Sequence, residues 1–165
     1  MKRTERLSLL LNENNLDAIF LTKRSNVNYI SKFTDEAAFV LACKDKFYLI
    51  TDGRFTELAQ KECVGFEVVN WHLFDRNLIK AVSHICNENG VKKLGFERSN
   101  ITFDRYEALK NMLSNVDLIG TDGLIESLRY VKDETEASYI KKACEIGDKA
   151  LEELVQNERC RRNRF

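Results

Sequence analysis

Residues 39–61, FVLACKDKFYLITDGRFTELAQK, carry the clearest structural pattern of this chain. Two short apolar runs, residues 39–42 and 47–50, flank a charged segment. Because aromatic and β-branched residues favour strands, whereas short charged segments favour turns, this pattern predicts a β-hairpin. Apolar residues at helical spacing follow the turn at residues 51–54, so the hairpin should lead into a helix with Asp52 as its candidate N-cap.

Strand and helix patterns alternate on both sides of the hairpin. Before it, Leu7, Leu10 and Leu11 form an apolar stripe that predicts an amphipathic helix. Further apolar or alternating runs predict strands at residues 16–21, 66–69, 93–96 and 116–119. Together with the hairpin, these segments predict a mixed α/β sheet covered by helices.

Two more helices are predicted between the later strands. An apolar face over residues 78–85 predicts the first, with Asp75 as its N-cap and Gly90 in a left-handed conformation just beyond its end. Thr102 should begin the second, with Phe103 on its inward face.

From Asp133 onward the pattern is that of one long amphipathic helix. Asp133 and Glu136 have capping-box spacing, and an apolar stripe follows opposite a ladder of lysines and glutamates. We therefore predict a domain over residues 1–131, an amphipathic helix over residues 132–155, and an irregular basic tail over residues 156–165.

Composition excludes several classes of function. Lysine plus arginine and aspartate plus glutamate both total 26, so no excess charge favours a nucleic acid or an anionic membrane surface. No apolar run is long enough to span a bilayer, and we expect a cytoplasmic protein. The five cysteines contain no CxxC pair, which favours reduced thiols, most of them in the core.

No residue pattern predicts a catalytic or metal-binding centre. The two histidines, His72 and His84, lack partners at ligand spacing, and no serine lies in a glycine-flanked turn. Asp52 and Arg54 lie at the carboxyl end of a strand, where α/β proteins often bind ligands. A helix cap and a local ion pair also account for them, so we assign this turn a structural or interface role.

Three segments, in this order, resemble the N-terminal domains of the creatinase, prolidase and aminopeptidase P family of "pita-bread" metallopeptidases. Residues 27–33, VNYISKF, are similar to a Tyr-Leu-Thr-Gly-Phe segment of that family, with Lys32 where the glycine is usual. Residues 49–62, LITDGRFTELAQKE, resemble its strand-turn-helix, and residues 128–136, LRYVKDETE, the start of its domain-joining helix. The resemblance implies a topology like that of ribonuclease H, followed by a long linker helix.

The resemblance also implies a function. In this family, two Asp, one His and two Glu of a C-terminal catalytic domain hold two divalent metals, Mn, Co or Zn, and short Xaa-Pro peptides are hydrolysed. The N-terminal domain lies at a homodimer interface and restricts access to the active site. This chain alone is therefore expected to be inactive, with no cofactor of its own.

Four positions match the family region that reaches toward the active site of the neighbouring subunit. They are Asn26, Tyr29, Asp35 and Glu36. The resemblance gives them a substrate-restricting or inter-subunit role. The alternative, from a different class, is a stand-alone binding or interaction module that has this fold without a peptidase role.

Overall fold

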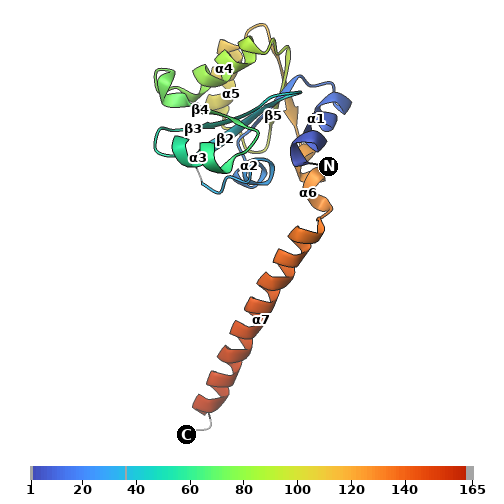
Figure 1. The fold of residues 1–165 in the computed structure, drawn as a ribbon, viewed down its shortest axis with the longest axis vertical. Coiled ribbons are helices and arrows are strands. Elements are labelled where there is room, and N and C mark those ends of the chain that lie inside the picture. The colour runs from blue at the N-terminus through green and yellow to red at the C-terminus, as the bar shows by residue number, and fades with distance from the viewer. Residues whose placement is uncertain (1, 36, 163–165) are drawn as a thin grey trace. The chain divides into compact units, whose positions relative to one another are not determined.

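The computed structural model describes residues 2–35 and 37–162. Six strands form one mixed sheet in the order β4-β3-β2-β1-β5-β6 (Figure 1). They are β1 (Ala18–Leu21), β2 (Ala38–Cys43), β3 (Phe47–Thr51), β4 (Glu67–Asn70), β5 (Lys93–Glu97) and β6 (Asp117–Thr121). Strand β2 runs antiparallel to β1 and β3, and the remaining pairs are parallel. The predicted mixed α/β class and all six predicted strands are confirmed.

The hairpin of β2 and β3 contributes residues to both hydrophobic cores, one on each face of the sheet. Val40 pairs with Leu49, and both belong to one core, whereas Leu41 and Tyr48 pair and belong to the other. The turn is closed by a hydrogen bond of 2.8 Å from the Cys43 N–H to the Lys46 carbonyl. Successive side chains of a strand point to opposite faces, so apolar residues at every position require helices on both sides.

Helices supply that cover. The helices of the globular part are α1 (Arg3–Glu13), α2 (Arg24–Ser31), α3 (Thr56–Glu62), α4 (Leu78–Glu88), α5 (Phe103–Met112) and α6 (Leu124–Tyr130), with a 3-10 turn η1 (Trp71–Leu73). Helices α1, α2, α3 and α6 share one core with the sheet, and α4 and α5 share the other. In Figure 1, α4 and α5 lie above the sheet and α2 and α3 below it. The sequence patterns did not predict α6.

Several helix ends differ in detail from the predictions. Helix α4 is capped by Asn77, whose side chain accepts from two backbone N–H groups, while Asp75 pairs with Lys80 at 2.7 Å. Helix α3 begins only at Thr56, so Asp52 is not its N-cap. Phe103 is 70% exposed, although it was predicted to face inward. Gly90 has the predicted left-handed conformation, with φ of 62°.

Three cysteines lie in the cores as reduced thiols, as predicted. Cys43, Cys63 and Cys86 are buried and form no disulfide. Burial raises the pKa of Cys43 and Cys63 to about 11 and that of Cys86 to about 12. These thiols therefore stay protonated at neutral pH and act as small apolar side chains.

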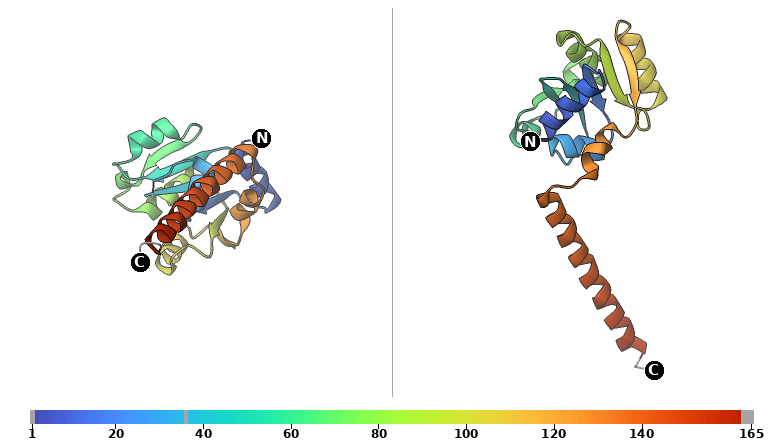
Figure 2. Two further views of the ribbon diagram at one scale, coloured as in Figure 1. Left: turned by 90° about the horizontal axis from the view of Figure 1, so that it is seen from below. Right: turned by 90° about the vertical axis from the view of Figure 1, so that its right-hand side faces the viewer.

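The chain divides after Leu128 into two compact units. The second unit contains α7 (Glu134–Arg162), a helix of 29 residues that both views of Figure 2 show as continuous. The Asp133 and Glu136 capping box forms as predicted, with hydrogen bonds of 2.8 and 2.9 Å. The helix continues to Arg162. The prediction of an irregular tail is therefore wrong for residues 156–162. Backbone hydrogen bonding extends a helix past the end of its apolar stripe, because arginine and glutamine are good helix formers.

No helix within residues 2–35 and 37–162 combines the length and the apolar character needed to cross a membrane.

Candidate functional site

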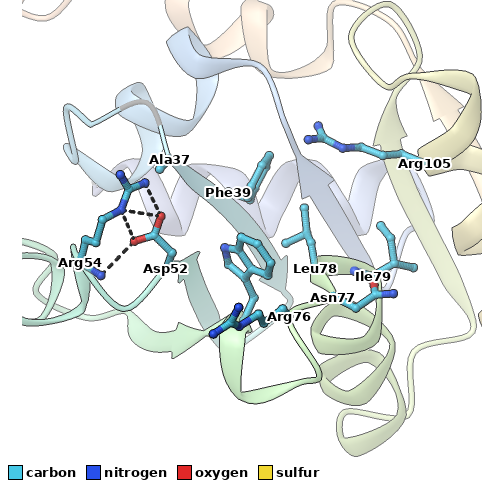
Figure 3. A pocket seen from close by; sticks show the side chains of 10 residues that line it. Ala37, Phe39, Asp52, Arg54, Arg76, Asn77, Leu78, Ile79 and Arg105 are labelled. Atoms are coloured by element: carbon cyan, nitrogen blue, oxygen red, sulfur yellow. Dashed lines mark hydrogen bonds and ion pairs between the residues drawn. The ribbon is translucent and has the colours of Figure 1, made fainter.

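A pocket of about 510 Å³ opens where β3 and β4 end and β2 begins (Figure 3). Segments that are distant in the sequence meet there: the turn after β3, the residue after β4, the start of α4, and α5. Its lining residues are Ala37, Phe39, Asp52, Arg54, Trp71, Arg76, Asn77, Leu78, Ile79 and Arg105. The volume lies within the range of small-molecule sites in proteins, roughly 300–1,000 Å³.

One end of the pocket holds the Asp52–Arg54 ion pair that the sequence predicted. Arg54 Nη2 lies 2.7 Å from Asp52 Oδ2, and the Arg54 backbone N–H donates to Asp52 Oδ1 at 2.9 Å. The Asp52 side chain is only 6% exposed, whereas that of Arg54 is 74% exposed. Hydrogen bonding from Arg54 holds the pKa of Asp52 below its ordinary value. The Asp52 carboxylate thus neutralises Arg54.

Two further guanidinium groups face the pocket without such compensation. Arg105 lies over the ring of Phe39, with its Cζ atom 5.1 Å from the ring centre. Arg76 has a left-handed backbone, with φ of 53°, in the turn before α4. In the part of the chain that the structure describes, neither guanidinium has a carboxylate within ion-pair distance. The lining therefore carries two positive charges in excess.

Two of the four predicted loop residues lie inside the domain, in α2. Asn26 is fully buried, and Tyr29 is 8% exposed. The Tyr29 hydroxyl donates to the Leu128 carbonyl at 2.8 Å. The Asn26 amide donates to Glu97 Oε1 at 2.6 Å and to Glu126 Oε1 at 2.9 Å. Asn26 and Tyr29 thus make contacts within the domain.

Glu97 and Glu126 are the partners that sequence patterns did not single out. Glu97, at the end of β5, also accepts the backbone N–H groups of Thr22 and Lys23, both at 2.6 Å. Glu126 pairs with the Lys23 amine at 2.8 Å. Burial alone would raise the pKa of Glu126, but the hydrogen bonds from Lys23 and Asn26 outweigh burial and lower it. We call Asn26, Glu97 and Glu126 the buried polar cluster, in which Asn26 and Glu97 are buried and the Glu126 side chain, at its edge, is 25% exposed.

Asp35 alone of the four lies in the described part of the loop between α2 and β2. Its carboxylate accepts the Ala37 N–H at 3.0 Å and is partly exposed. Glu36 lies outside the described residues. Lys32, at the end of α2, has a φ of 65°, the left-handed conformation that glycine adopts most readily. The backbone at Lys32 is therefore one that the family's usual glycine would also adopt.

Within residues 2–35 and 37–162, no group of three or more His, Cys, Asp or Glu side chains could hold a metal ion. His72 lies edge-on against Trp71, with ring centres 4.3 Å apart, and His84 Nε2 is 3.4 Å from Glu88 Oε1. The described residues therefore do not fit the two-metal centre that the resemblance implies for a complete enzyme.

Residues 3–131 match the model of the Creatinase/Prolidase N-terminal domain. The chain belongs to this family. An Xaa-Pro dipeptidase from Pyrococcus horikoshii is 28% identical to this chain. The match covers 94% of this chain and 42% of the dipeptidase. The solved structure of an Xaa-Pro dipeptidase from Bacillus anthracis superposes with a TM-score of 0.85 at 35% identity, covering 93% of this chain and 42% of the other.

A third comparison concerns a structure of similar extent. The crystal structure of the N-terminal domain of a cytoplasmic peptidase from Mycobacterium tuberculosis matches with a TM-score of 0.69 at 31% identity, covering 76% of this chain and 97% of that domain. This chain spans about 42% of the length of two of its curated relatives, a peptidase from Bacillus subtilis and the dipeptidase from Pyrococcus horikoshii.

Proposed function

We propose that this creatinase/prolidase N-terminal domain is the non-catalytic part of an Xaa-Pro dipeptidase or aminopeptidase. Its role is to assemble a homodimer and to restrict access to the active site to short proline-containing peptides. The family match over residues 3–131 carries this proposal, since the relatives that share it include Xaa-Pro dipeptidases. In the complete cytoplasmic enzyme, a C-terminal catalytic domain would hold two divalent metals, Mn, Co or Zn, and hydrolyse the bond before proline.

The second candidate is a stand-alone binding module. The pocket next to β3 and β4 favours it, because two uncompensated arginines can bind a ligand without a catalytic domain. The reading frame downstream of Phe165 separates the two candidates. A following segment with the Asp, Asp, His, Glu, Glu metal-ligand pattern supports the peptidase role, and a stop codon supports the module.

The isolated chain is expected to show no Xaa-Pro dipeptidase activity. Because the described residues bring no metal-ligand cluster together, Gly-Pro and Ala-Pro should stay intact in the presence of Mn²⁺ or Co²⁺. The measurement is dipeptide hydrolysis, together with metal analysis of the purified chain. The Xaa-Pro dipeptidase from Pyrococcus horikoshii is the positive control. Turnover that follows the protein through purification would refute the division of labour between the two domains.

Asp35 is expected to affect substrate selection more than chemistry. In a complete enzyme that carries this domain, Asp35→Ala should raise KM for di- and tripeptides roughly 3- to 10-fold while kcat and metal content stay the same. Asp35→Asn retains the acceptor for the Ala37 N–H and removes only the charge, so it separates charge from loop geometry. Asp45→Ala, in the exposed turn of the hairpin, is the matched control. Equal KM values in all variants across a di- to pentapeptide series would remove the loop from substrate selection.

A further inference from the structure

We propose that the pocket between Phe39, Trp71, Arg76 and Arg105 binds an organic carboxylate whose apolar body packs against the pocket walls. The proposal concerns this domain by itself and does not rest on the peptidase role. It depends on three properties of the pocket: its uncompensated charge, its apolar walls and its size.

The charge selects an anion. Asp52 compensates the charge of Arg54 through a hydrogen-bonded ion pair, so the uncompensated charge of the lining lies on Arg76 and Arg105. Arg76 and Arg105 line the pocket from different elements, the turn before α4 and helix α5, and their guanidinium groups lie apart from each other (Figure 3). A planar guanidinium matches a carboxylate with two parallel hydrogen bonds, which makes arginine the preferred residue for such ligands.

The walls select an anion with an apolar body. Phe39, Trp71, Leu78 and Ile79 line the same pocket as the two arginines. A volume of about 510 Å³ is far larger than a phosphate or sulfate ion requires and suits a ligand that buries an aromatic or aliphatic group. Inorganic anions could use only the guanidinium groups and would leave the apolar surface in contact with water.

The start of α4 adds a favourable field, while two of its backbone donors are already occupied. Asn77 Oδ1 accepts the N–H groups of Ile79 and Lys80, at 2.9 and 3.1 Å, so these donors are already occupied. The positive end of the helix dipole still lies beside the pocket and favours negative charge there. We assign contact with the carboxylate to the arginine side chains because they carry the uncompensated charge of the lining.

Ligand binding in the pocket can be followed by the fluorescence of Trp71. Trp71 is the single tryptophan of the sequence, and it lines the pocket. Phenylacetate is the probe, titrated at constant ionic strength. We expect a saturable change in Trp71 fluorescence with a Kd of about 1 mM, as suits a ligand of so few atoms. Phenylacetamide has the same shape without the charge and should bind at least ~10-fold more weakly, and inorganic phosphate should give no saturable change.

Matched variants assign the site. Arg76→Gln and Arg105→Gln should each weaken phenylacetate binding about 10-fold. Arg98→Gln is the control, because Arg98 is an exposed arginine that pairs with Asp122 and does not line the pocket. Thermal unfolding of each variant establishes that it is folded. Backbone amide shifts in NMR spectra should move at residues 37–39, 52–54, 71–79 and 105 in the wild-type protein.

Four outcomes would overturn the proposal. The first is the absence of any saturable signal up to about 20 mM phenylacetate. The second and third are an affinity for phenylacetamide, or for phosphate, equal to that for phenylacetate. The fourth is a loss of phenylacetate affinity in the folded Arg76 and Arg105 variants that is no greater than the loss in Arg98→Gln.

Discussion

Replacing Glu97 with alanine is expected to lower the free energy of unfolding by about 4 kcal/mol, the largest effect that we predict for a single side chain. Glu97 is 6% exposed and accepts three hydrogen bonds of 2.6 Å, from the Thr22 and Lys23 N–H groups and from the Asn26 amide. Alanine would leave the part-buried Thr22 and Lys23 N–H groups without this acceptor and would remove one of the two carboxylates to which the Asn26 amide donates. The cost is large because Glu97 holds both residues that lead into α2, and the N-cap residue Lys23 makes no side-chain cap hydrogen bond there.

Glu97, at the end of β5, thus holds the two residues that lead into α2, which lie 75 and 74 residues earlier in the sequence. Urea unfolding followed by circular dichroism measures the effect. Glu107→Ala is the control, since Glu107 lies exposed in α5, and its removal should change stability by no more than about 0.5 kcal/mol. If the two variants unfold at the same urea concentration, the buried polar cluster does not stabilise the domain.

Replacing Asn26 with aspartate is expected to destabilise the domain by about 3 kcal/mol at pH 7. The substitution removes the amide donor between Glu97 and Glu126 and places a third carboxyl group at a fully buried position. Both burial and the neighbouring carboxylates raise the pKa of the introduced carboxyl in the folded state above its unfolded value. Its charged form is therefore disfavoured by folding.

The pH dependence follows from that direction. A group whose pKa is raised in the folded state costs stability above its unfolded pKa, and the cost disappears as the pH falls. The difference in unfolding free energy between Asn26→Asp and Asn26→Ala should therefore shrink between about pH 7 and pH 4. The alanine variant lacks both the donor and the carboxyl, so it is the matched reference at each pH. A constant difference over this range would show that Asn26 is not enclosed by acidic groups.

The strands and most helices were predictable because the apolar pattern that specifies each of them lies within its own segment of sequence. Residues 39–42 and 47–50 are apolar at successive positions, and burial on both faces of the sheet requires such runs. Helix caps were less predictable. Asp75 and Asn77 are both good capping residues, and only the backbone path determines that Asn77 lies next to the free N–H groups of α4.

Asn26 shows what a local pattern leaves out. Its proposed place near the active site came from its match to the family region. In the structure, it is enclosed by Glu97 and Glu126, which are 71 and 100 residues further along the chain. A polar residue is buried wherever distant residues offer it partners, and no periodicity reveals such partners.

The pattern of apolar residues and three family-like segments sufficed to establish the mixed α/β class, the order of strands along the chain and the family. The pocket and the buried polar cluster depended on the folded chain. Arg54 follows β3, Arg76 precedes α4, and Arg105 lies in α5. No local sequence pattern marks any of the three as a pocket residue. They line one pocket because the order of strands in the sheet brings their segments together. Topology sets a side chain's neighbours in space, whereas hydrophobic periodicity reports only which face of its own element is buried.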